Sequence, residues 1–336
     1  MPSRPLSQHP LRRRFPAVVG CLALLAAGAA RAGGSDEASP LPAPPADPAA
    51  TLAAALAAGD HERALPLALA LHEEAEARHV EALYTVARLH GLLGRPDEAF
   101  AWLERAAATG LLGVQEVRRD EAFAALRDEA RFQDLTRQIW LKGYLWLLER
   151  PERDAYQQPE EVMRLLAVRP GERVADIGAG SGYFTLRLAR AVGPEGRVRA
   201  LDINDLLLDL LRGRVAEAGL AQVEVAKVQP DDPLLAPASV DLILMVDTLH
   251  YVKDRPAYAR RLAAGLAPGG RIAIVDFLPK PLEERPWGPP PEQEMPRAEV
   301  DAAMAAAGLV PAAVHHFLAE QFFVVYRRAE ETASAP

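Results

Sequence analysis

Cysteine is almost absent from this 336-residue chain, whose one cysteine is Cys21. A lone thiol has no second cysteine with which to form an internal disulfide or a thiolate metal site. Cys21 also lies in a segment that we expect to be removed from the mature protein. A disulfide scaffold, a thiolate metal centre and a cysteine nucleophile are therefore excluded.

Long hydrophobic runs are lacking as well. The apolar stretch AVVGCLALLAAGAA covers residues 17–30, which is shorter than the roughly 20 residues that span a bilayer as a helix. Arginines precede it, and Ala30-Arg31-Ala32 after it has the form of a signal-peptidase site. Residues 1–32 are therefore predicted to be a signal peptide, and the mature chain to be a periplasmic or secreted bacterial protein without a stable membrane span. An uncleaved anchor is the alternative.

Basic residues are outnumbered, at 38 against 46 acidic residues. Cleavage after Ala32 would remove five arginines and no acidic residue, leaving 33 basic and 46 acidic residues and a net charge of −13. Such a chain has no broad basic surface for DNA or RNA. We predict a small-molecule substrate and no nucleic-acid partner.

A helical segment follows a short linker. Residues 33–50 are rich in Pro, Ala, Gly and Ser and are predicted to be a linker, and residues 51–138 have helical patterning throughout. Within it, GDHERA from Gly59 resembles GRPDEA from Gly94, an offset of 35 residues. This period and the small residues Ala87, Ala99 and Ala106 resemble a degenerate pair of tetratricopeptide repeats, which implies a possible protein partner. An Ala-rich bundle that only packs on the next domain is the alternative.

Residues 139–330 are predicted to form a second domain, in which strand and helix signals alternate over residues 173–327. The β-rich runs VADIG, VRALDI, VEVAKV, DLILMVD and RIAIVDF predict parallel strands separated by helices. The last two runs, in GLVPAAVHHFLAEQFFVVYRR, are too close together for a crossover helix, so the final strand should be antiparallel. The predicted fold is an α/β doubly wound, mostly parallel seven-stranded sheet with an antiparallel last strand, followed by a tail at residues 331–336.

A glycine-rich turn follows the first of these strands. The stretch DIGAGSG at residues 176–182 has alternating glycines, unlike the G-x-G-x-x-G of hydride-transfer enzymes. Together with LAPGGRIAIVDF at residues 266–277 and the closing hairpin, it resembles the class I S-adenosylmethionine-dependent methyltransferases. Within them, YQQPEEV and VDTLHY resemble the small-molecule enzymes near the ubiquinone-biosynthesis and arsenite types. The absence of cysteine ligands argues against arsenic chemistry.

This resemblance implies S-adenosylmethionine as cofactor and a set of binding residues. Asp176 would orient the turn and the methionine ammonium, the glycines would permit close approach, and Asp202 would hold the ribose. Ile203 would pack on the purine, and Asp231 or Asp232 would meet its amino group. The predicted cofactor residues are Asp176, Gly178, Gly180, Gly182, Tyr183, Asp202, Ile203, Asp231 and Asp232.

Asp247 and His250 follow the fourth strand, at the sheet edge where open α/β folds bind ligands. They are the catalytic candidates, with His250 as the base, because an imidazole accepts a proton near neutral pH. A packing role for His250 is the alternative. His315 and His316 are adjacent and would face opposite sides of a strand, so no metal site is predicted.

Two other functions remain open from the sequence. The first is an exported binding or scaffold protein with a relic methyltransferase fold, which would need no cytosolic cofactor after export. An NAD-dependent oxidoreductase is disfavoured by the glycine spacing and the closing hairpin.

Overall fold

The computed structural model describes residues 47–281, 289 and 291–329. It divides the chain into an N-terminal unit, Met1–Trp140, and a C-terminal unit, Leu141–Pro336. The predicted signal peptide, the linker up to residue 46 and the tail lie outside the described residues. In the part of the chain that is described, no helix is long and apolar enough to cross a membrane.

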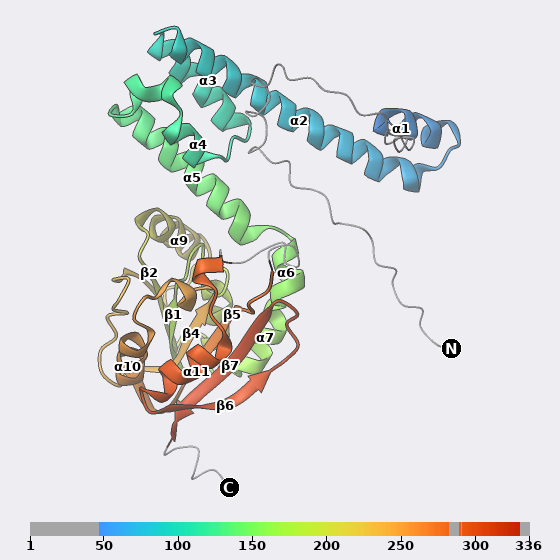
Figure 1. The fold of residues 1–336 in the computed structure, drawn as a ribbon. Helices are drawn as coiled ribbons and strands as arrows, with labels where there is room; N and C mark the ends of the chain where they lie inside the picture. Colours follow the sequence, from blue (N-terminus) through green and yellow to red (C-terminus); the bar gives the residue numbers. More distant parts are fainter. Residues whose placement is uncertain (1–46, 282–288, 290, 330–336) are drawn as a thin grey trace, which may run out of the picture. The chain divides into compact units, whose positions relative to one another are not determined.

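The N-terminal unit is helical (Figure 1). Its elements, the last of which continues into the next unit, are α1 (Pro48–Ala57), α2 (His61–Leu92), α3 (Pro96–Thr109), α4 (Val114–Arg119), the 3₁₀ helix η1 (Glu121–Leu126) and α5 (Ala130–Glu149). The core of the unit includes Leu103, Phe123 and Ile139, which are all fully buried.

The α2 helix departs from the repeat pattern. A tetratricopeptide repeat pairs short helices across turns, whereas residues 61–92 form one continuous helix of 32 residues. Between Pro66 and Gly91 the sequence has neither proline nor glycine, so nothing interrupts the helix. The repeat resemblance is therefore not confirmed, although the turns at Gly59 and Gly94 do separate consecutive helices.

The C-terminal unit is built on a seven-stranded sheet in the order β3-β2-β1-β4-β5-β7-β6. Its strands are β1 (Arg173–Ile177), β2 (Arg197–Asp202), β3 (Val223–Lys227), β4 (Val240–Val246), β5 (Leu266–Phe277), β6 (Leu309–His315) and β7 (Gln321–Arg328). The first five strands run parallel to one another, and β7 pairs antiparallel with both β5 and β6. The predicted mostly parallel sheet with an antiparallel last strand is confirmed.

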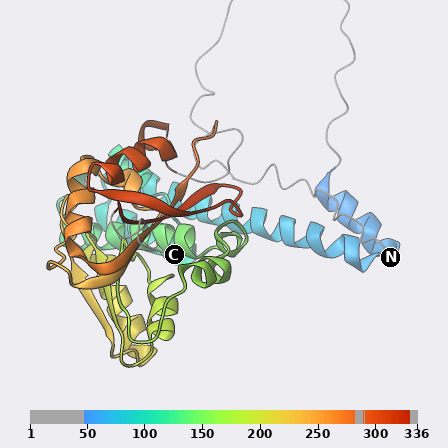
Figure 2. The same cartoon turned by 90° about the horizontal axis from the view of Figure 1, so that it is seen from below.

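Helices cover both faces of this sheet (Figure 2). They are α6 (Glu152–Gln157), α7 (Pro159–Leu166), α8 (Thr185–Val192), α9 (Asp205–Glu217), α10 (Arg255–Gly265) and α11 (Arg297–Ala305), with short 3₁₀ helices η2 (Leu249–Tyr251) and η4 (Pro291–Gln293). Successive side chains on β4 point to opposite faces, so Ile243 packs in the core with α10 and α11, and Leu244 packs in the core with α7 and α8.

The strand order reverses between β1 and β4, whose carboxyl ends lie side by side. In open α/β sheets this reversal opens the crevice in which ligands bind. The end of β5 and the start of β7 also lie at this edge, because Phe277 pairs with Gln321. The topology therefore brings the ends of β1, β2, β4 and β5 and the beginning of β7 to one candidate site.

Candidate cofactor and active site

The predicted glycine turn joins β1 to α8, and all three of its glycines have positive φ angles. A Cβ on Gly178 would lie 2.1 Å from the Oγ1 of Thr248, and a Cβ on Gly182 would lie 2.4 Å from the Cδ1 of Leu211. These two glycines are therefore required by packing within the protein.

Gly180 differs from its neighbours. Its φ is +55°, and the atom nearest to an added Cβ would be the Cδ1 of Leu148, the flexible end of a side chain, at 3.3 Å. The side of Gly180 on which a Cβ would lie is thus nearly open. This is the position in the turn at which a ligand can approach the backbone.

Asp202 ends β2 beside this turn and is 8% exposed. Its Oδ2 accepts a hydrogen bond from the Gly180 amide at 2.9 Å, and its Oδ1 accepts one from the Asn204 amide at 2.9 Å. Each carboxylate oxygen keeps a further lone pair for a ligand hydroxyl. Ile203, the next residue, is 52% exposed and offers an apolar surface beside the carboxylate.

Asp176 lies beneath the turn and not at its surface. It is 3% exposed, and its Oδ2 accepts a hydrogen bond from the hydroxyl of Thr185 at 2.6 Å. Burial raises the pKa of Asp176 to about 6. The carboxylate therefore fixes the start of α8 to the end of β1.

Asp232 uses its carboxylate within its own loop and with α10, whereas Asp231 is exposed and contacts α10 through its main chain. The main-chain carbonyl of Asp231 accepts a hydrogen bond from Arg261. Asp232 accepts a hydrogen bond from the Leu234 amide at 2.8 Å and lies 3.5 Å from the Nε of Arg261. Their predicted contact with the adenine stays a prediction.

Asp247 follows β4 in a left-handed conformation, with φ +51°. Its Oδ2 accepts a hydrogen bond from the Nε2 of Gln157 at 2.9 Å, and its Oδ1 accepts one from the Nε2 of Gln321. Burial raises the pKa of Asp247 to about 6, against the lowering effect of the Arg153 charge. A non-glycine residue held at positive φ is strained, and such residues cluster at functional sites.

His250 forms a buried pair with a carboxylate that sequence reasoning missed. Its Nδ1 lies 2.8 Å from the Oδ1 of Asp276, and the two side chains are 3% and 2% exposed. The amide of His250 also donates to Asp276 at 3.3 Å. Asp276 lies at the carboxyl end of β5, and the rule that placed Asp247 and His250 at this edge could have found it.

Three tyrosines approach the same edge. Tyr144 on α5 forms a hydrogen bond with Tyr251. Burial raises the pKa of Tyr144, with further contributions from nearby Tyr251, Asp202 and Asp247. Tyr251 is itself 58% exposed, so its side chain is accessible to a ligand at this edge of the sheet.

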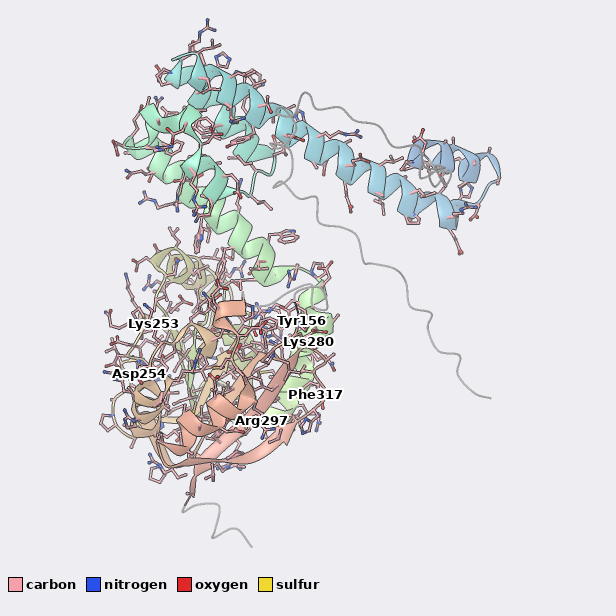
Figure 3. All side chains as sticks on the ribbon, viewed as in Figure 1. Tyr156, Lys253, Asp254, Lys280, Arg297 and Phe317 are labelled. Carbon is pink, nitrogen blue, oxygen red and sulfur yellow. The ribbon has the colours of Figure 1, made fainter. Side chains whose placement is uncertain are left out.

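Tyr156, labelled in Figure 3, closes another part of the edge. Its ring centroid is 6.3 Å from that of Phe277, at the end of β5. The ring of Tyr251 packs on the imidazole of His250 with a centroid separation of 4.1 Å. The catalytic candidates therefore stand among aromatic rings that can pack against a small acceptor.

The contacts of Tyr183 are with side chains of the protein, whereas it was predicted to bind the cofactor. Its hydroxyl donates to Asp154. The guanidinium groups of Arg153 and Arg187 lie over its ring, 4.0 and 4.4 Å from the centroid. In this structure Tyr183 therefore supports two arginines, and direct contact with a cofactor stays a prediction.

Among the residues that the structure describes, no three His, Cys, Asp or Glu side chains are grouped so that they could hold a metal ion. His315 packs on the ring of Phe323 at 4.7 Å. Its pKa is lowered, chiefly by burial.

Residues 174–270 match the family model for the methyltransferase domain. This match lies within the C-terminal unit and includes β1 to β4 and the start of β5. The chain resembles the crystal structure of an S-adenosylmethionine-dependent methyltransferase from Aquifex aeolicus, with 28% identity and a TM-score of 0.51 over 55% of this chain and 96% of that one. That likeness covers a larger share of the chain than the match to the family model does.

Curated relatives are similar over part of their length. The ubiquinone/menaquinone biosynthesis C-methyltransferase of Teredinibacter turnerae is 34% identical over 116 residues, which cover 34% of this chain and 47% of that protein. The nocamycin O-methyltransferase of Saccharothrix syringae is 33% identical over 129 residues, 38% of this chain and 46% of that protein. The chain thus spans about half the length of these relatives. The domain match and the similar proteins support S-adenosylmethionine-dependent methyl transfer as the chemistry of this site.

Proposed function

We propose that this protein transfers the methyl group of S-adenosylmethionine to a small-molecule acceptor. The proposal rests on the place where the glycine turn after β1 adjoins the carboxyl end of β2. There the open side of Gly180 adjoins the carboxylate of Asp202, and the two are joined by a 2.9 Å hydrogen bond.

The residues at this edge fit the cofactor. The free lone pairs of Asp202 can accept the two ribose hydroxyls, and exposed Ile203 can pack on the purine. When bound, the cofactor supplies an electrophilic methyl group on a sulfonium. The carboxylates of Asp202 and Asp247 favour the binding of a cation at the same edge.

His250 and Asp276 are the pair that we propose to remove a proton from the acceptor. The carboxylate of Asp276 accepts the Nδ1 proton of His250 and so leaves Nε2 as the basic nitrogen. Asp276 thereby orients the imidazole and stabilises the imidazolium that forms. Most of the rate can come from alignment, because a thioether is a good leaving group.

We also propose export and a recruiting role for the N-terminal unit. Residues 1–32 have the composition of a signal peptide, and residues 51–138 resemble repeats that bind protein partners. Mass spectrometry of the native N-terminus tests export, and an intact Met1 on cytosolic protein would contradict it. Pull-downs with residues 33–138 test recruitment, and repeated recovery of no specific partner would contradict it.

The activity is tested with S-adenosylmethionine labelled in its methyl group. The parent and Asp202→Ala proteins are incubated with the small-molecule fraction of a bacterial extract. We expect the parent to place label in a new small product, and the variant to lose most of that transfer. Label that stays in the donor, or that enters only protein or nucleic acid, would contradict the proposal.

A further inference from the structure

A cavity in the N-terminal unit is lined by arginines, and none of the described residues that line it is acidic. Its volume is about 410 Å³, which is in the range of small-molecule sites. Three successive parts of the chain contribute one guanidinium each: the end of α4, the residue after η1, and α5. The lining residues are Arg118, Arg127, Phe132, Gln133, Thr136 and Arg137.

This lining differs in charge from the sequence around it. Residues 118–137 contain five arginines and five acidic residues, and the whole chain has more acidic than basic residues. Folding separates the two signs: Asp120, for example, accepts hydrogen bonds from Tyr84 and Arg88 on α2. Guanidinium groups that surround one cavity repel one another, and an anion among them removes that repulsion.

Arg127 is held on one side and lacks an acceptor on the other. Its Nη2 donates to the main-chain carbonyls of Arg119 at 3.3 Å and Asp120 at 3.2 Å, and to the Oε1 of Glu121 at 3.0 Å. Its Nε is buried and has no hydrogen-bond partner among the described residues. A buried donor without an acceptor is costly, most of all on a charged group, and native proteins contain few of them. An oxygen of a bound anion would satisfy this donor.

The other two guanidinium groups are accessible to a ligand. Arg118 is exposed in the last turn of α4, and its side chain forms no ion pair or hydrogen bond with any residue that the structure describes. Arg137 pairs only with Asp134, one turn earlier on α5, and both of these side chains are 55% exposed. An exposed ion pair of this kind contributes little to stability, so Arg137 can exchange it for a ligand at small cost.

The floor of the cavity is ordered and buried. Phe132 and Thr136 are 3% and 2% exposed. Gln133, Thr136 and Arg137 are three and four residues apart on α5 and therefore share one face of that helix. The Nε2 of Gln133 also donates to the main-chain carbonyl of Arg127 at 3.4 Å, which links α5 to the end of η1. The cavity thus has a buried floor and charged side chains at its rim.

We propose that this cavity binds a small polyanion, whose carboxylate or phosphate groups are held by Arg118, Arg127 and Arg137. A guanidinium presents paired N–H donors that match the oxygens of a carboxylate or a phosphate. The size of the cavity favours a small ligand over an acidic segment of a protein. The site lies within the N-terminal unit and goes beyond the proposed methyl transfer, on which it does not depend.

The test is calorimetric titration of the full chain with citrate and, separately, with pyrophosphate. Salt at about 0.15 M screens exposed charges that are not part of a site. We expect saturable binding of at least one of the two anions, and their relative affinities distinguish a carboxylate ligand from a phosphate ligand. Trimethyl citrate has the same skeleton as citrate without its charges and should not bind. Saturating S-adenosylhomocysteine should not displace the anion, because its proposed site lies in the C-terminal unit.

Two substitutions of exposed arginines locate the site. Arg118→Met and Arg137→Met should each weaken the bound anion about fivefold or more. Arg119→Met is the matched control, because it removes the same charge from the next residue of α4, whose side chain does not line the cavity. It should change the affinity less than about twofold. Arg127 is left unchanged, because its Nη2 also binds the end of α4.

Three results would overturn the site: no saturable binding of either anion, binding of trimethyl citrate as tight as that of citrate, or displacement of the anion by S-adenosylhomocysteine. A loss in Arg119→Met equal to that in Arg118→Met would also overturn it, because the anion would then respond only to overall charge. A tetraglutamate peptide that binds more tightly than both anions would indicate an acidic protein segment as the occupant and overturn the assignment of a small ligand.

Discussion

Replacing Gly180 by alanine should separate cofactor binding from folding. The added Cβ would project into the nearly open side of the turn, where only the end of Leu148 lies near it, at 3.3 Å. A ligand that approaches the backbone there would meet this methyl group. We expect S-adenosylmethionine to bind Gly180→Ala more than tenfold more weakly, a loss of about 1.4 kcal/mol or more.

The cost to folding should be small at this position. A left-handed conformation costs a non-glycine residue about 1–2 kcal/mol, and the contact with Leu148 can be relieved by rotation of its side chain. Gly178→Ala is the matched comparison. It has the same backbone penalty, and its Cβ would also lie 2.1 Å from Thr248 Oγ1 and 2.5 Å from Thr248 Cγ2. Overpacking of this kind costs about 1–3 kcal/mol more.

Calorimetric titration and urea unfolding of the two variants measure both quantities. The account predicts that Gly180→Ala loses affinity while it keeps most of its free energy of unfolding, and that Gly178→Ala loses considerably more of that free energy. If Gly180→Ala binds like the parent, the ligand does not approach the turn there. If the free energy of unfolding of Gly180→Ala falls as far as that of Gly178→Ala, the space beside Gly180 is not open to a Cβ.

Three further substitutions test the surrounding carboxylates. Asp202→Ala should weaken S-adenosylmethionine by about 1–3 kcal/mol in calorimetry, because two ribose hydroxyls lose their acceptor; unchanged binding would refute the ribose role. Asp276→Asn should slow methyl transfer while the cofactor affinity stays within twofold, because the substitution affects the orientation of His250 and the stability of its imidazolium; an unchanged rate would show that the His250–Asp276 pair has only a packing role. Asp176→Asn removes a carboxyl whose pKa is raised to about 6, and a raised pKa stabilises the folded parent at low pH and ceases to do so as the pH rises through 6. In denaturant titrations, the stability of Asp176→Asn relative to the parent should therefore increase by about 2 kcal/mol between pH 4.5 and 7.5, and a pH-independent difference would refute the shift.

The sheet was predictable because its signals are local. Each strand is a short β-rich run, and the gap before EQFFVVYRR was too short for a crossover, which fixed the antiparallel hairpin of β6 and β7. The position of Asp202 beside Gly180 was predictable for a similar reason. Neighbouring parallel strands end at the same edge of the sheet, so the end of β2 lies beside the turn that follows β1.

Side chains that meet from distant parts of the chain were not predictable in this way. Gln157 and Gln321 are 164 residues apart, and no periodicity in either segment points to the other. The antiparallel direction of β7 was the available signal, because it brings the start of that strand to the carboxyl end of β5. Asp276 could have been found by the same reasoning.

The central claim is that the crevice between β1 and β4 binds S-adenosylmethionine. Its most direct test is calorimetric titration of the purified full chain with S-adenosylmethionine and, separately, with NADH. The account predicts one saturable binding event for S-adenosylmethionine, displaced by S-adenosylhomocysteine, and no binding of NADH. Saturable binding of NADH, with none of S-adenosylmethionine, would contradict it.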